Sequence, residues 1–362
     1  MRGVSPLLKR VVYPSLAKAG VFRRICGPGL AVLTYHGIRP REYQPIDAAF
    51  DGNLIEAEIF RKQLVLLKKS YTVVSPEDVL AWCEERGKLP ARAVLLTCDD
   101  GLLNNLTDML PVLQQEQVKC LFFVTGASAG LSRGTLWYED LFLIFFRAPA
   151  AHFEVSCGDS TINGDLTEPG KRHAAWWNVV KRLSQVDAET RNSFLQEARL
   201  VLSAGPTQIA ASSVSERRFG LLVRDELRQL AAAGMTIGAH TLNHPMLSQC
   251  PAEIAWDEIS ESRTHLEAAL QTPVWAMAYP FGDRESVTPD ILNMARDAGY
   301  KAAFMNFGGG LGAALPRHAI PRIHVTTQMS LAELEANVAG FYTALQRWAG
   351  RNGQQSWQMA AG

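Results

Sequence analysis

The stretch Ala93–Gly101, AVLLTCDDG, sets two carboxylates, Asp99 and Asp100, directly after an unbroken apolar run. Such a run is typical of a parallel strand that is buried on both faces. Adjacent carboxylates at the end of a buried strand are costly unless a cation or a proton neutralises one of them. The stretch therefore predicts a buried strand that ends in a charged site.

Similar apolar runs alternate with helical patterns along the chain. We expect strands at 30–35, 71–74, 93–98, 119–125, 235–239, 274–279, 301–305 and 320–325. We expect helices at 57–69, 76–86, 102–115, 224–233, 251–270 and 289–298. This alternation predicts an α/β fold, either a barrel or a doubly wound sheet.

One long stretch interrupts the alternation. It holds an aromatic helical pattern at 137–146, a polar, turn-rich run at 156–164 and two helical patterns within 171–204. This stretch is too long for a simple connection, so we expect an inserted, mostly helical subdomain at 131–222. The whole chain then divides into a basic N-terminal segment (1–29), a barrel (30–346) that carries the insertion, and a C-terminal tail (347–362).

Composition excludes several classes of protein. The 362 residues carry 36 basic and 36 acidic side chains, and this zero net charge argues against a general nucleic-acid binder. No apolar run approaches the roughly 18 residues that span a bilayer. The six cysteines form no CxxC pair, which favours reduced thiols. With no recognisable signal peptide, the expected location is the cytoplasm.

The charge is unevenly distributed. The first 41 residues hold eight basic side chains and no acid, which leaves 28 basic and 36 acidic side chains in the remainder. Apolar residues recur between these cations at helical spacing. A helix packed on the domain explains this pattern best, and peripheral contact with an anionic membrane at its inner face is the second interpretation.

Two further motifs follow predicted strands. His240–Pro245 (HTLNHP) follows the apolar run at 235–239, and Tyr279–Gly282 (YPFG) ends the run at 274–279. Imidazoles four residues apart can converge on one ion, and together with one Asp they leave coordination positions open, as a catalytic metal site requires. Each motif alone is weak, but three of them at three strand ends indicate one site.

Together, TCDDG, HTLNHP and YPFG resemble the successive motifs of polysaccharide deacetylases, the NodB-homology domain of carbohydrate esterase family four. The usual forms there are T-F-D-D-G, H-[ST]-x-x-H-P and R-x-P-[YF]-G. The resemblance runs from about Leu30 to Val325, apart from the insertion. It implies a distorted (β/α) barrel and a hydrolase that removes an N-acetyl group from an amino sugar in a polysaccharide, an oligosaccharide or a lipid-linked precursor.

The resemblance also implies roles for individual residues. Asp100, His240 and His244 would bind a divalent metal, zinc first, with cobalt, manganese or nickel as alternatives. Asp99 would be the general base, and the backbone N–H of Phe281 would stabilise the oxyanion.

The sequence departs from the family's pattern at two positions. Cys98 replaces the usual Phe, and Ala278 replaces the Arg that orients the base carboxylate. Arg322, within the expected last strand, is our candidate to replace that Arg.

Two histidines compete for the role of catalytic acid. His324 has roughly the family's C-terminal position, whereas His36 ends the first strand in Thr34-Tyr35-His36-Gly37, as in apparently permuted members. We favour His36, because it ends a clean apolar strand and Gly37 permits a tight turn. The remaining histidines, His152, His173, His265 and His318, belong to no motif.

Two other functions remain open. Ser128 lies in a literal G-x-S-x-G at 126–130, so a serine hydrolase is one alternative, although the residues after it indicate a loop rather than the helix that a nucleophile elbow needs. A catalytically degenerate barrel that binds saccharide is the other. Four aromatic residues of the insertion can stack on sugar rings, although core packing explains such residues more often: Trp137, Tyr138, Trp176 and Trp177.

Overall fold

The computed structural model describes residues 8–25, 29–48, 50–204, 212–308 and 316–341. Its strands are β1 (Leu30–Tyr35), β2 (Thr72–Val73), β3 (Ala93–Cys98), β4 (Leu121–Val124), β5 (His152–Cys157), β6 (Ser160–Asp165), β7 (Thr236–Ala239), β8 (Ala276–Ala278), β9 (Ala302–Gly308) and β10 (Ile320–His324). Its α-helices are α1 (Tyr13–Lys18), α2 (Val21–Ile25), α3 (Ala57–Ser70), α4 (Pro76–Cys83), α5 (Leu110–Gln115), α6 (Trp137–Arg147), α7 (Pro169–Leu183), α8 (Ala188–Val201), α9 (Ser213–Phe219), α10 (Arg224–Ala232), α11 (Ala252–Leu270), α12 (Pro289–Asp297) and α13 (Leu331–Val338).

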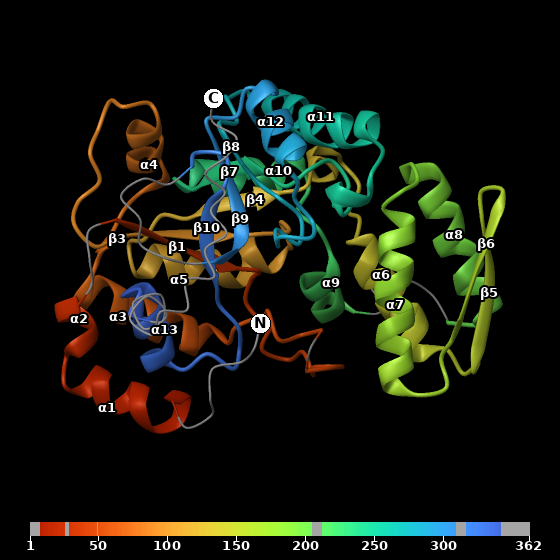
Figure 1. Ribbon diagram of the computed structural model, residues 1–362, viewed down its shortest axis with the longest axis horizontal. Helices are drawn as coiled ribbons and strands as arrows, with labels where there is room; N and C mark the ends of the chain where they lie inside the picture. Colours follow the sequence, from red (N-terminus) through yellow and green to blue (C-terminus); the bar gives the residue numbers. More distant parts are fainter. Residues whose placement is uncertain (1–7, 26–28, 49, 205–211, 309–315, 342–362) are drawn as a thin grey trace.

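Parallel strands close into a barrel with helices around it (Figure 1). The order is β1-β10-β9-β8-β7-β4-β3, and β3 pairs with β1 to close the ring. Strand β2 pairs only with the first part of β3, and β4 pairs with its last part. The predicted distorted (β/α) barrel is confirmed, and every predicted barrel strand is present within a few residues of its expected bounds.

Alternate residues of each strand point into the barrel or out toward the helices. On β1, Leu30 and Val32 belong to the inner cluster, which fills the barrel, and Ala31 and Leu33 belong to a larger outer cluster with residues of α3, α10 and α11. The inner cluster contains many small side chains. Gly238 shows how tight it is, because a Cβ there would lie 2.6 Å from the Phe123 ring. The barrel below its carboxyl-terminal rim is therefore filled.

The insertion has a hydrophobic core of its own, built from α6, α7, α8 and the β5–β6 hairpin. The helices were predicted, but the expectation of a turn-rich run at 156–164 was wrong, because β5 and β6 form an antiparallel hairpin there. Strand β5 alternates exposed and buried residues, whereas β6 buries only Ile162. With a single buried residue, β6 has no apolar alternation from which a strand could be predicted.

The two N-terminal helices pack on the barrel's last helix, α13. Tyr13 and Phe22 are buried there and contact each other edge to face. Among the described residues, no helix is both long and apolar enough to cross a membrane. The predicted tail at 347–362 lies outside the described residues.

Candidate active site

Asp100, His240 and His244 come together where β3 and β7 end. Their ligand atoms all lie within 4.8 Å of one another, and all three residues are buried. Asp100 Oδ1 is 3.6 Å from His240 Nε2 and 3.4 Å from His244 Nε2. Four ligands about 2.1 Å from an ion at the corners of a tetrahedron lie about 3.4 Å apart, so this spacing fits a metal ion.

Contacts behind these residues fix their orientation. His240 Nδ1 is 2.7 Å from the carbonyl oxygen of Ala278, which leaves Nε2 as the ligand atom. Burial lowers the pKa of His240 to about 4, so its imidazole is neutral, as metal binding requires. Glu258 of α11 accepts hydrogen bonds from the backbone N–H of Asn243 at 2.7 Å and from its side-chain amide at 3.0 Å, which holds the loop between the two histidines.

Sequence reasoning missed Glu258. A pattern was available, because Glu258 shares the buried face of α11 with Ala255, Ile259 and Ser262. A carboxylate on the buried face of an amphipathic helix needs a polar partner inside the protein.

Asp99 and Arg322 form a bidentate pair inside the barrel. The guanidinium donates to both carboxylate oxygens at 2.7 and 2.6 Å, and Arg322 also bonds the carbonyl oxygen of Met305 and the hydroxyl of Thr97. Burial raises the pKa of Asp99, but the charge and hydrogen bonds of Arg322 together with His240 and His36 outweigh it, so the net pKa is lowered. Asp99 is therefore ionised and oriented, which is what a general base needs. Arg322 thus makes the contact to Asp99 that the resemblance assigns to an Arg at the position of Ala278.

Both candidate acids lie at this site. The rings of His36 and His324 have centroids 4.9 Å apart and are tilted by 56°. Gly37 lets the chain turn beside His36, with φ +130°, and a Cβ there would lie 2.1 Å from Asn104 Oδ1.

The turn at Phe281 is held rigidly. Phe281 has φ +60°, the N–H of Gly282 bonds the carbonyl oxygen of Pro280, and the N–H of Asn306 bonds the carbonyl oxygen of Gly282 at 2.7 Å. The Phe281 ring lies 5.2 Å from that of His244. The turn that carries the predicted oxyanion donor therefore lies beside His244.

Aromatic residues of the insertion form a wall against the loop that runs from His240 to His244, which we call the ligand loop. The ring of Tyr138 contacts that of His244 at a tilt of 38°, with centroids 4.8 Å apart, and Trp137 donates its indole N–H to the His244 carbonyl oxygen at 3.2 Å. Trp177 contacts Phe281 edge to face, and Trp176 donates to the carbonyl oxygen of Tyr138. Trp137 is thus a packing residue, whereas Tyr138 and Trp177 border the site.

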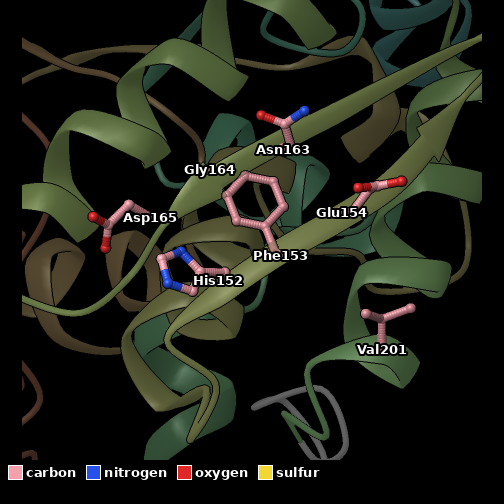
Figure 2. A pocket seen from close by; sticks show the side chains of 7 residues that line it. All are labelled: His152, Phe153, Glu154, Asn163, Gly164, Asp165 and Val201. Atoms are coloured by element: carbon pink, nitrogen blue, oxygen red, sulfur yellow. The ribbon is translucent and has the colours of Figure 1, made fainter.

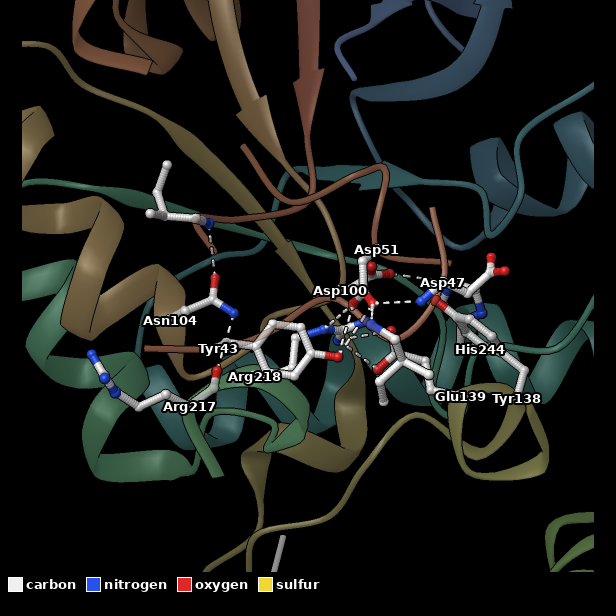
Figure 3. A network of polar contacts seen from close by, with 12 residues as sticks. Tyr43, Asp47, Asp51, Asp100, Asn104, Tyr138, Glu139, Arg217, Arg218 and His244 are labelled. Carbon is white, nitrogen blue, oxygen red and sulfur yellow. Dashed lines mark hydrogen bonds and ion pairs between the residues drawn. The ribbon is translucent and has the colours of Figure 1, made fainter. Parts of the chain in front are cut away.

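A buried charge network joins the insertion to the loop after β1 (Figure 3). Arg218 of α9 donates to Asp51 at 2.9 Å and to Glu139 of α6 at 3.0 Å, and the Tyr43 hydroxyl donates to Asp51. Burial raises the pKa of Glu139 to about 7, although Arg218 opposes this. No sequence pattern pointed to these residues.

Two other places do not form a site. Ser128 lies in a 3₁₀ helix after β4, with its Oγ 3.4 Å from that of Thr125, so the strand-to-helix turn of a serine nucleophile is not formed. A broad, shallow depression lies on the β5–β6 hairpin and the end of α8, lined by His152, Phe153, Glu154, Asn163, Asp165 and Val201 (Figure 2). The hairpin lies at the far edge of the insertion, away from the barrel (Figure 1).

Solved structures of similar fold extend over most of the chain. The chain is 19% identical to a deacetylase, PplD, from Streptococcus pyogenes, with a TM-score of 0.54 over 86% of this chain and 99% of that one. It is 18% identical to IcaB from Ammonifex degensii, with a TM-score of 0.53 over 86% and 98%. For a de-N-acetylase from Aggregatibacter actinomycetemcomitans the identity is 14% and the TM-score 0.50, over 85% and 99%. A search of curated proteins finds no match.

The family comparison is decisive. The polysaccharide deacetylase model matches residues 86–141 and 171–303, more than half of the chain. These ranges include TCDDG, HTLNHP and YPFG, whereas His36, Arg322 and His324 fall outside them. The chain therefore belongs to the polysaccharide deacetylase family and is an enzyme of saccharide de-N-acetylation.

Proposed function

We propose that the chain is a metal-dependent N-deacetylase in which Asp100, His240 and His244 hold a divalent ion, zinc first, and Asp99 is the general base. The observation that carries the proposal is the convergence of three buried ligand atoms within 4.8 Å, beside a carboxylate that is ionised and oriented by Arg322. A buried group of one carboxylate and two neutral imidazoles suits a borderline ion and leaves coordination positions open.

A divalent ion held there would supply Lewis-acid polarisation of the acetyl carbonyl and would lower the pKa of an attacking water. Asp99 takes the proton from this water as the water attacks the carbonyl carbon. The backbone N–H of Phe281 donates to the oxyanion that forms. His36 then donates a proton to the departing nitrogen, because an amide anion is too poor a leaving group.

The substrate is an N-acetylated saccharide, and the aromatic wall supports its placement. Tyr138, Trp177 and Phe281 lie on the insertion side of the ligands, where they can contact the apolar face of a sugar ring. Since the barrel below the rim is filled, the acetyl group enters from the rim.

Acetate release from chito-oligosaccharides tests the proposal. We expect Asp99→Asn to bind zinc but lose activity by about 1,000-fold or more, because the base is gone. We expect His244→Ala to lose both zinc, measured by mass spectrometry, and activity. Asp159→Asn and His265→Ala are the matched controls, since both side chains are exposed and remote from the site.

Inhibitors provide a second test. A chelator should abolish acetate release, and added zinc should restore it. A serine-directed fluorophosphonate should have no effect. Activity that survives both Asp99→Asn and His244→Ala, or that resists the chelator, would refute the proposal.

We also propose that the protein acts in the cytoplasm, in contact with an anionic membrane surface through its N-terminal helices. In the described part of this segment, Arg10, Lys18 and Arg24 are exposed, and so are the apolar side chains of Val11 (54%) and Ile25 (44%). Cations beside exposed apolar residues suit an anionic leaflet. Flotation with phosphatidylglycerol vesicles should carry the protein upward, and Arg10→Glu with Lys18→Glu should prevent this.

A further inference from the structure

The strand register brings three polar side chains into one layer at the top of the barrel. Thr34 of β1 lies opposite Thr97 of β3 and opposite His324 of β10. Paired residues of parallel strands point to the same face, and so do residues two apart along a strand. His36 and Asp99, each two residues beyond its threonine, therefore share the inner face with His324. The mechanism proposed above uses His36 and Asp99 but leaves His324 without a role.

The two imidazoles have complementary nitrogens without partners. Within the described residues, His36 Nδ1 and His324 Nε2 are both shielded from solvent and have no hydrogen-bond partner. A buried polar atom without a partner costs about 1–3 kcal/mol, and a neutral imidazole carries one donor and one acceptor. With ring centroids 4.9 Å apart, a rotation of either ring can bring these two nitrogens together.

The surroundings keep His324 neutral. Burial, and then the neighbouring His36, lower the pKa of His324 to about 3, with Arg322 acting in the same direction and Asp99 and Asp100 opposing it. A neutral imidazole can accept a hydrogen bond at one nitrogen, which an imidazolium cannot do.

We propose that His324 is a positioning residue for the catalytic acid, whose Nε2 accepts a hydrogen bond from Nδ1–H of His36. This bond directs Nε2 of His36 toward the substrate and stabilises the imidazolium that donates the proton. As the C–N bond breaks, its electron pair stays on the leaving nitrogen and takes up the proton from Nε2 of His36. The electron pair of that N–H bond stays on His36. His36 becomes neutral and keeps its Nδ1–H on His324. This inference rests on the proposed function, because it assigns the acid to His36.

The test compares two leaving groups in the zinc-loaded enzyme. An N-acetylated sugar needs a proton on its leaving nitrogen, whereas 4-nitrophenyl acetate releases a stable phenolate that needs none. We expect His324→Leu to lower kcat on chito-oligosaccharides about 10- to 100-fold with little change in KM, and to leave aryl ester hydrolysis within about twofold of wild type. His324→Gln, whose side-chain carbonyl can accept the same hydrogen bond, should recover most of the loss.

Nitrogen-15 spectra of the imidazoles add a readout that does not depend on activity. In wild type, His36 should be protonated at Nδ1, and His324→Leu should shift its tautomer population toward Nε2–H. Equal losses on amide and ester, or an unchanged His36 tautomer in His324→Leu, would overturn the inference. A wild-type enzyme that releases no acetate from the oligosaccharide would refute the proposed function instead, and the tautomer measurement would still decide the pairing of the two histidines.

Discussion

The barrel and the insertion both bury charged side chains, but in different ways. In the barrel, Asp99 after β3 and Arg322 of β10 meet at the carboxyl-terminal rim, on two parallel strands that both pair with β1. In the insertion, Arg218 of α9 donates to Glu139 of α6 and also to Asp51 of the loop after β1, so it joins the insertion to that loop. In the proposed mechanism the first pair orients the general base, whereas the second joins the insertion to the loop after β1. The comparison teaches that buried ion pairs differ in role: one orients a side chain of the proposed site, and the other joins separate parts of the chain.

The strongest way to break this comparison is to remove Arg322. We expect Arg322→Met to lower kcat by about 100-fold, because Asp99 loses its orientation and its counter-ion. The pKa of Asp99 should rise, so the acidic limb of the kcat profile should move to higher pH. Arg317→Met, an exposed arginine paired with Glu85, is the control and should behave as wild type. If the acidic limb does not shift, Arg322 does not set the pKa of Asp99.

Removing Arg218 tests the structural half of the comparison. Arg218→Met leaves Asp51 and Glu139 buried without a counter-ion, and we expect the free energy of unfolding to fall by about 3–5 kcal/mol in urea. Its neighbour Arg217 forms more exposed ion pairs with Glu42 and Asp108, so Arg217→Met should cost about 1 kcal/mol or less. If folded Arg218→Met loses as much kcat as Arg322→Met, the two pairs do not differ in role.

The pH dependence of stability should differ in sign between the two regions. In the metal-free protein the pKa of His324 is lowered to about 3, so the unfolded chain binds the extra proton, and stability rises as the pH increases from about 3 to 6.5. The pKa of Glu139 is raised to about 7, so the folded chain binds the extra proton, and stability falls as the pH increases from about 4.5 to 7.

Single substitutions separate these two contributions. Measured in urea at several pH values, His324→Leu should remove the rise and Glu139→Gln the fall. Each should change the slope by at most about 1.4 kcal/mol per pH unit. A change of slope with the same sign in both variants would contradict the assignment of the rise to His324 and of the fall to Glu139.

The smallest expected effect concerns a contact from the insertion to the ligand loop. The Ser184 hydroxyl, at the end of α7, accepts from the backbone N–H of Met246 at 2.9 Å, two residues after His244. Ser184→Ala should cost about 1 kcal/mol of stability and lower kcat only a few-fold. Gln185→Ala, at the exposed neighbouring position, should change neither quantity. A loss of kcat as large as that of Arg322→Met would show that the insertion shares in catalysis.

Local patterns predicted an α/β fold and the residues of its rim, and the resemblance to polysaccharide deacetylases implied the barrel. Apolar runs marked the strands, and the residues just after them had to share one rim, which brought Asp99, Asp100, His240 and His244 together. Arg322 was a candidate because the resemblance requires an Arg to orient the base carboxylate, Ala278 stands in its usual place, and Arg322 lies at a strand end.

The insertion was harder to predict, and so were the supports of the site. Strand β6 buries one residue and gives no periodic pattern. Arg218 meets Asp51 across 167 positions of sequence, a pairing that no local rule can specify. His36 and His324 were treated as rivals, because spacing along the chain cannot show that β1 and β10 are neighbours.

The backbone at the rim has a consequence for the ion site proposed there. Asp100, Thr241, His244 and Phe281 all have φ between +59° and +76°, a region that residues with side chains rarely adopt. Each such conformation costs of order 1 kcal/mol or more, and it persists only because the surrounding fold imposes it. The free energy needed to arrange the ligands is thus expended during folding, before any ion arrives. A loop bearing HTLNHP transplanted to another scaffold would carry both histidines and still lack the site.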